Sequence, residues 1–132
     1  MAEKLFLEVV TPQKAIVSEE VEIVIAPGSE GEFGVLKGHT TFLTSLKIGT
    51  LRYKDAKGKE RYLFINGGFA EVLPDKVTIL AESAERRRDI DVERAKRAKE
   101  RAEKRLAEKS EGMDFARAEV ALQRAVHRLK LK

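Results

Sequence analysis

The hydrophobic pattern of the chain changes its period once, close to Ala84. Before that point, short segments rich in Val, Ile, Leu, Phe and Thr recur about every 8 to 12 residues between turn residues, as in a β-sandwich or barrel. Beyond it, apolar residues recur with the period of an α-helix. We therefore predict a β + α chain, in which residues 1–86 form an antiparallel β-sandwich domain and residues 87–132 form an antiparallel two-helix hairpin domain.

The expected strands are short, and most are separated by recognisable turns. Along the second segment, Val21, Ile23 and Ile25 alternate with more polar or smaller residues, which predicts that these three side chains share the buried face. The strand segments, in chain order, are LFLEVV, VEIVIA, EFGVL, TFLTSLKI, TLRYK, ERYLFI, FAEVL and KVTIL.

Three turns are expected from glycine and proline. DAKGK is a hairpin turn in which Gly58 accommodates a positive φ, and LPDK is a tight reversal because Pro74 presets φ. Gly67 and Gly68 are expected to form a turn before the strand through Phe69.

Two apolar stripes with helical spacing follow, and Gly112 and Asp114 between them are expected to end the first helix and cap the second. Alanine is frequent in both stripes, so at roughly 25 cal/mol per Å² the two helices gain little by packing. Such a hairpin is either a two-state element or an ordinary exposed hairpin that rests on the sandwich. The stripes are Val92, Ala95, Ala98, Ala102 and Leu106, then Phe115, Ala118, Leu122, Ala125 and Leu129.

The positive charge of the chain is concentrated in the helical tail. Residues 1–85 carry 10 Lys or Arg against 13 Asp or Glu, net −3, whereas residues 86–132 carry 16 against 9, net +7. This asymmetry indicates an anionic partner for the tail: nucleic acid, a membrane surface, a nucleotide or an acidic protein face.

Several kinds of site are not expected from this sequence. The chain has no cysteine, which excludes thiol catalysis, and its two histidines, His39 and His127, form no metal-binding motif. There is no Walker-type loop, and no grouped nucleophile and base that would support a hydrolase. No segment is long and apolar enough to span a bilayer, so the chain itself is expected to be soluble.

A small β-barrel that binds nucleic acid through a basic helical tail is the main alternative. A single-strand binder of that kind interleaves aromatic residues with its cations, whereas residues 85–132 contain only Phe115. The nine acidic residues of the tail also oppose tracking along a phosphate backbone.

Four segments, in this order, resemble the epsilon subunit of the bacterial F-type ATP synthase: GSEGEFGVLKGH, GGFAEV, DKVTILA and IDVERA. The resemblance covers almost the whole chain. One departure is Thr41, where many members have proline.

The resemblance implies a non-catalytic rotor subunit with a ten-stranded β-sandwich, placed against the gamma subunit and the ring of c subunits. The glycine-rich loop would contact the ring through Glu32 and His39. The hairpin would permit ATP hydrolysis when folded on the sandwich and would inhibit it when extended toward the alpha and beta subunits. The protein would then lie peripherally on the cytoplasmic side of the cell inner membrane, associated with it only through a proton-translocating complex.

In some members the folded hairpin binds ATP through a motif of Ile or Leu, Asp, two variable residues, Arg and Ala. No cofactor would be required, and ATP would act as a regulatory ligand clamping the hairpin shut. Arg105 and Arg117 also coincide with arginines of such members, with a less direct role. The residues implied for ATP binding are Glu85, Ile90, Asp91, Arg94, Ala95, Arg101, Arg124 and Arg128.

Overall fold

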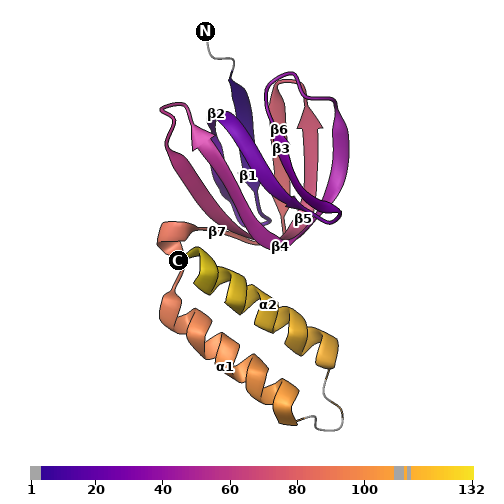
Figure 1. Ribbon diagram of the computed structural model, residues 1–132, viewed down its shortest axis with the longest axis vertical. Helices are drawn as coiled ribbons and strands as arrows, with labels where there is room; N and C mark the ends of the chain where they lie inside the picture. The colour runs from indigo at the N-terminus through magenta and orange to yellow at the C-terminus, as the bar shows by residue number, and fades with distance from the viewer. Residues whose placement is uncertain (1–3, 109–111, 113) are drawn as a thin grey trace.

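The computed structural model describes residues 4–108, 112 and 114–132. Its strands wrap around one core, and a pair of antiparallel helices projects from one end of it (Figure 1). This arrangement confirms the predicted β + α class. The strands are β1 (Leu5–Val10), β2 (Ala15–Gly28), β3 (Gly31–Val35), β4 (Phe42–Asp55), β5 (Glu60–Leu73), β6 (Lys76–Ala81) and β7 (Ala84–Arg86).

The sheet closes on itself through β1. In the order β1-β6-β5-β4-β2-β3, β1 also pairs with β2, so five strands form a flattened barrel to which β3 and β7 are attached. The pairings are antiparallel except for β1 with β6, which is parallel, a departure from the antiparallel sandwich expected.

Three strands are longer than the sequence pattern indicated. β2, β4 and β5 each run for 14 residues. The segments TFLTSLKI and TLRYK, expected as separate strands, both belong to β4, and ERYLFI and FAEVL both belong to β5. The described residues therefore contain seven strands and not ten.

The expected turn at Gly67 and Gly68 is wrong, because both residues lie inside β5. Their φ angles are +71° and +131°, and they let the strand bend without ending. A Cβ atom at Gly68 would collide with the backbone of Leu80 on β6. The other two predicted turns are confirmed, at DAKGK with Gly58 at φ +80° and between Leu73 and Lys76.

The barrel encloses one apolar core. A register shift on β2 between Val21 and Ile23 changes the phase of the alternation. As a result Val21, Val24 and Ala26 are buried, whereas Ile23 and Ile25 are only partly buried. The prediction that Ile23 and Ile25 share the buried face with Val21 is therefore wrong, because a bulge moves the side chains to the opposite face.

The 3₁₀ turn η1 (Arg87–Asp89) leads from β7 to α1 (Val92–Glu108), which is followed by α2 (Phe115–Leu131). Asp114 caps α2 as predicted, since its carboxylate accepts a hydrogen bond from the amide of Arg117 at 3.0 Å. Gly112 has φ +77°, while residues 109–111 and 113 of the expected connection lie outside the described residues.

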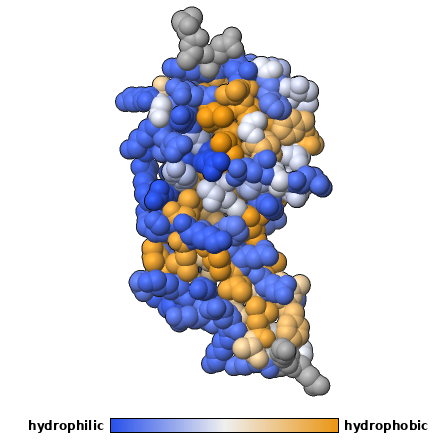
Figure 2. All heavy atoms as spheres, viewed as in Figure 1, coloured by the Kyte–Doolittle hydropathy of each residue, from blue (hydrophilic) through white to orange (hydrophobic). Residues whose placement is uncertain are grey.

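Helix α2 lies against β4 and β5, and α1 lies against α2 on the side away from the barrel (Figure 1). A small apolar cluster of Phe64, Ile90 and Leu131, with Ile48 and Tyr62 around it, joins the two parts. In Figure 2, apolar residues are visible where the hairpin meets the barrel, flanked by hydrophilic ones. The described helices include none with the length and apolar character needed to cross a bilayer.

Candidate functional site

A cavity of about 760 Å³ lies between the two helices and reaches the end of the barrel. Its walls come from β7, η1, the start and inner face of α1, and the inner face of α2. The lining residues are Glu85, Asp89, Asp91, Arg94, Ala95, Ala98, Arg101, Ala102, Arg105, Ala118, Ala121, Arg124 and Arg128.

Helical periodicity places these side chains on facing surfaces. The lining residues of each helix follow one another at intervals of one, three or four residues, so they share one face. Asp91 begins this face on α1, where its carboxylate accepts the amide hydrogen of Arg94 at 3.0 Å and caps the helix.

Alanine makes room for the cavity. Ala95, Ala102 and Ala118 are almost fully buried and line it, and Ala125 is fully buried in α2. Small side chains bring the helix backbones close together and leave space between the longer arginines. Phe115, expected on this seam, lies at the start of α2 and is 45% exposed, more than the alanines of the seam.

Positive charge predominates in the cavity, with five arginines against three carboxylates. Within the residues that the structure describes, no ion pair joins Arg101, Arg105 or Arg124 to a carboxylate. Like charges on two facing helices repel one another, so this arrangement favours a polyanion between them.

Arg128 is held at the barrel end of the cavity. Its Nε donates to Glu85 Oε1 at 2.7 Å, and its guanidinium carbon lies 4.4 Å from the ring centroid of the buried Phe64. Both partners of the ion pair are partly buried, with side-chain exposures of 25% and 31%. The pair therefore connects α2 to β7.

The structure brings together seven of the eight residues implied for ATP binding. Ile90 is the exception, because its side chain is 4% exposed within the cluster of Phe64 and Leu131 and does not line the cavity. Arg105 lines the cavity, whereas Arg117 does not.

The site also has lining residues that sequence reasoning did not name. Asp89 follows β7 in a 3₁₀ turn that no pattern in the sequence indicated, and Ala121 lies beside the predicted stripe. Ala98, Ala102 and Ala118 were expected only as packing residues of the helix seam. A small residue beside an arginine on the same helix face is a sequence signal for a cavity at that position.

The two residues implied for contact with the c ring lie on the barrel, away from this cavity. Glu32 on β3 is exposed and accepts a hydrogen bond from Arg52 on β4 at 3.1 Å. His39 lies in the segment between β3 and β4, where its Nδ1 is 2.9 Å from the carbonyl oxygen of Thr40 and its ring is 5.3 Å from that of Phe42.

Four groups outside the cavity have shifted pKa values, those of Tyr53, Asp55, Tyr62 and His127. Burial, with the charges of Lys130 and Lys47, lowers the pKa of His127. Burial raises the pKa of Tyr53, against the opposing hydrogen bond from Arg86. Among the described residues, no cluster of three or more His, Cys, Asp or Glu side chains is placed to hold a metal ion.

Comparison with known proteins assigns both parts of the chain to one family. Residues 4–87 match the family model of the ATP synthase delta/epsilon chain β-sandwich domain, and residues 88–132 match that of the delta/epsilon chain long α-helix domain. The fold and the hairpin described above are thus those of an ATP synthase delta/epsilon chain.

Two relatives are each named ATP synthase epsilon chain. That of Desulforapulum autotrophicum is 72% identical over 131 residues, covering 99% of this chain and 97% of the relative. That of Nitratidesulfovibrio vulgaris is 57% identical over 132 residues, covering 100% of this chain and 98% of the relative. The chain belongs to the family of bacterial F-type ATP synthase epsilon subunits.

Solved structures agree with this assignment. A chain in the Euglena gracilis mitochondrial ATP synthase, in a structure of OSCP, F1 and c-ring, is 30% identical, with a TM-score of 0.80 over 91% of this chain and 76% of that one. A chain from the central stalk and c-ring of the Tetrahymena thermophila mitochondrial ATP synthase is 15% identical with a TM-score of 0.59, which supports the fold.

Proposed function

We propose that this chain is a non-catalytic subunit of the central stalk of a proton-translocating ATP synthase, on the cytoplasmic side of the inner membrane. The barrel couples the c ring to the gamma subunit. The hairpin restrains ATP hydrolysis when it extends toward the alpha and beta subunits, and ATP bound in the cavity holds it folded. Family membership and the likeness to the Euglena chain support the first part of this proposal.

The arginine-lined cavity is the observation that carries the ATP part. Its volume of about 760 Å³ lies within the range of small-molecule sites, roughly 300 to 1,000 Å³. Along α1, Arg94 and Arg105 are eleven residues apart, about 16 Å at the helical rise, which suits an extended nucleotide.

The distribution of charge in the cavity suggests how a nucleotide would lie. Carboxylates gather near the barrel at Glu85, Asp89 and Asp91, where they would accept hydrogen bonds from adenine or ribose. Arg101 and Arg124 on the two helices would donate to the phosphates. A triphosphate would then bridge α1 and α2.

Ligand binding accounts for the proposed control. A ligand that binds only the folded hairpin shifts its equilibrium by RT ln(1 + [L]/Kd), about 2.7 kcal/mol at 100 times Kd. An alanine seam of small buried area is weak enough for such a shift to decide the balance.

The barrel surface supports contact with other subunits. Leu43, Phe69 and Leu80 are more than half exposed, and Phe69 is the register partner of Leu80 across β5 and β6. Leu43 lies two residues from the partner of Phe69 on β4, on the same face. An exposed apolar group of this kind is typical of a protein contact, and we assign it to the gamma subunit. Glu32 on β3 and His39 in the segment after β3 are assigned to the c ring.

Calorimetry with ATP on the purified chain tests the ATP part. Arg124→Gln removes one proposed phosphate contact and is expected to weaken ATP binding roughly tenfold or more. Arg97→Gln is the matched control, because Arg97 is an exposed arginine of α1 that does not line the cavity. Absence of binding to the parent chain, or equal affinity in both variants, would contradict ATP binding at this site.

A further inference from the structure

A second pocket, of about 300 Å³, lies where the barrel meets the hairpin. It is formed by the beginning of β5, the end of β7 with η1, and the residue that follows α2. Five cations and one carboxylate line it. Its residues are Glu60, Arg61, Tyr62, Arg86, Arg87, Arg88 and Lys132. We call it the junction pocket.

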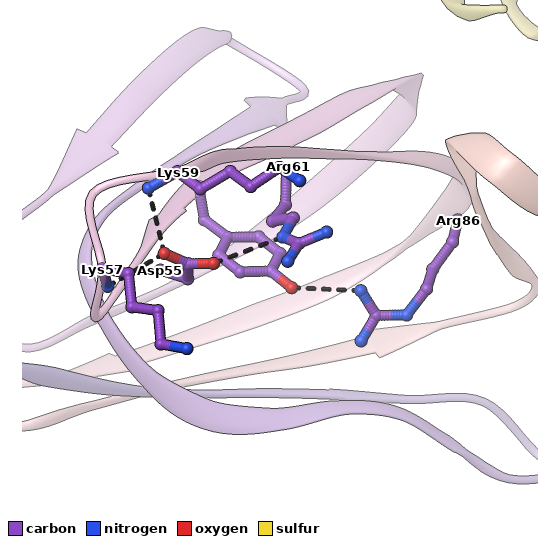
Figure 3. A network of polar contacts seen from close by, with 6 residues as sticks. Asp55, Lys57, Lys59, Arg61 and Arg86 are labelled. Carbon is purple, nitrogen blue, oxygen red and sulfur yellow. Dashed lines mark hydrogen bonds and ion pairs between the residues drawn. The ribbon is translucent and has the colours of Figure 1, made fainter.

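On the barrel side, two of these cations are fixed in place. Arg86 donates to the hydroxyl of Tyr53 at 3.2 Å and to the carbonyl of Ile16 at 3.1 Å, both uncharged acceptors. Arg61 donates a hydrogen bond from Nε of its guanidinium to Asp55 Oδ2 at 3.3 Å. Figure 3 shows Arg61 and Arg86 projecting from neighbouring strands of the barrel.

On the hairpin side, Lys132 and Arg87 contact uncharged groups. Lys132 Nζ donates to the carbonyl oxygens of Arg87 and Arg88 at 3.1 and 3.2 Å. The guanidinium of Arg87 lies 5.3 Å from the ring centroid of Tyr62. Arg88 is 4.0 Å from Asp89, and both side chains are largely exposed.

The remaining charge makes the pocket a site for an anion. Its one lining carboxylate, Glu60, already accepts the hydroxyl hydrogen of Tyr62 at 2.7 Å. Cations this close together repel one another unless an anion lies among them, and arginine suits tetrahedral oxyanions because it donates two parallel hydrogen bonds. The volume is less than half that of the cavity between the helices, so the ligand is smaller than a nucleotide.

We propose that the junction pocket binds a small phosphate anion, inorganic phosphate or pyrophosphate. Arg61 and Arg86 belong to the barrel, whereas Lys132 moves with α2. A bound anion therefore ties the hairpin to the barrel and favours the folded arrangement by linkage. This site is separate from the cavity assigned to ATP and does not depend on that assignment.

Calorimetry with pyrophosphate and with phosphate on the full chain tests the proposal. The measurements use the Arg124→Gln variant, so that binding in the cavity between the helices is weakened, and sodium chloride at equal ionic strength as the blank. We expect one bound anion per chain. Adding Arg87→Gln or Arg88→Gln should lower the affinity roughly tenfold, whereas Arg87→Lys and Arg97→Gln should lower it less.

Hydrogen exchange on the same samples shows whether the anion acts at the junction. Pyrophosphate should slow exchange at the end of α2 in the Arg124→Gln chain and lose this effect when Arg88→Gln is added. Arg88 is largely exposed, so this variant keeps the fold. Three outcomes would overturn the proposal. Arg124→Gln alone could abolish anion binding, all variants could bind the anion equally, or sodium chloride could reproduce the effect.

Discussion

Glu85 and Arg128 form an ion pair across the junction of barrel and hairpin. The contact is 2.7 Å long, and the guanidinium also covers the ring of Phe64. Because both charges are partly buried, they interact more strongly than an exposed pair of the same geometry. The same two side chains line the cavity assigned to ATP. Their ion pair joins the hairpin to the barrel without a nucleotide.

We predict that Glu85→Gln weakens docking of α2 on the barrel. The change leaves Arg128 without its carboxylate partner, which costs roughly 1 to 3 kcal/mol. Hydrogen exchange of the α2 amides without nucleotide measures this loss. Arg52→Gln is the control, because it removes the exposed pair with Glu32, worth at most about 1 kcal/mol. Equal exchange in both variants would show that the Glu85 pair does not hold the hairpin.

At the residue scale, the sequence motif predicted which side chains gather. The spacing of Asp91, Arg94 and Arg101 is fixed by one helix, so their common face follows from the period alone. Ile90 could not be placed in this way. It lies between η1 and α1, and its direction depends on the contact with Phe64 and Leu131, residues distant in the sequence.

At the element scale, the alanine seam determines how firmly the hairpin closes. Ala125 is fully buried and does not line the cavity, so a larger side chain at this position would displace its neighbours.

We predict that Ala125→Leu opens the hairpin. A leucine there overpacks the seam at a cost of about 1 to 3 kcal/mol, and ATP affinity should fall because the cavity walls separate. Ala107→Leu on the exposed face of α1 is the matched control and should leave ATP affinity unchanged. Calorimetry compares the two, and undiminished affinity in Ala125→Leu would mean that the seam does not shape the site.

The pH dependence of docking follows from His127 on α2. Burial, then the charges of Lys130 and Lys47, lower its pKa in the folded chain. A base with a depressed pKa contributes stability that is present above its unfolded pKa of about 6.5 and is lost as pH falls.

We predict that α2 exchanges its amide hydrogens faster, after correction for intrinsic rates, when pH falls from about 7.5 to about 5.5. His127→Gln should remove most of this change because glutamine does not titrate. If the variant keeps the full pH dependence, another group is responsible.

The elements themselves were predicted unevenly. The two helices followed from their period and from the Asp114 cap, which depends on local residues. The bulge of β2 did not, because it shifts the register against β4 and is decided by that pairing. The length of β5 did not either, because Gly67 and Gly68 adopt positive φ inside the strand and do not end it. Closure through the parallel pair β1 and β6 joins residues about seventy positions apart, which no local pattern specifies.

At the scale of the whole molecule, the barrel and the hairpin are two units joined by a small apolar cluster and a few polar contacts. The barrel closes through its own strands, and the hairpin adds to it without completing the sheet.

We predict that a chain ending after Arg86 still folds as a barrel. In the assembled complex it should support rotation but raise ATP hydrolysis, since the element proposed to restrain hydrolysis is gone. Circular dichroism of the truncated chain and ATPase assays of the complex check the two parts. A random-coil spectrum would refute independent folding, and unchanged hydrolysis would refute the regulatory role.

The proposed role of ATP is to hold the hairpin folded on the barrel. The chain has no cysteine, so Lys57→Cys on the barrel and Lys104→Cys on α1 place two dyes at exposed positions without competing thiols. Energy transfer between them, measured in the assembled complex as ATP is added, reports the position of the hairpin. We predict that ATP increases the folded population in the parent chain and has a much weaker effect when Arg124→Gln is added. An equal response in both chains, or a hairpin that ignores ATP in the parent, would contradict the account.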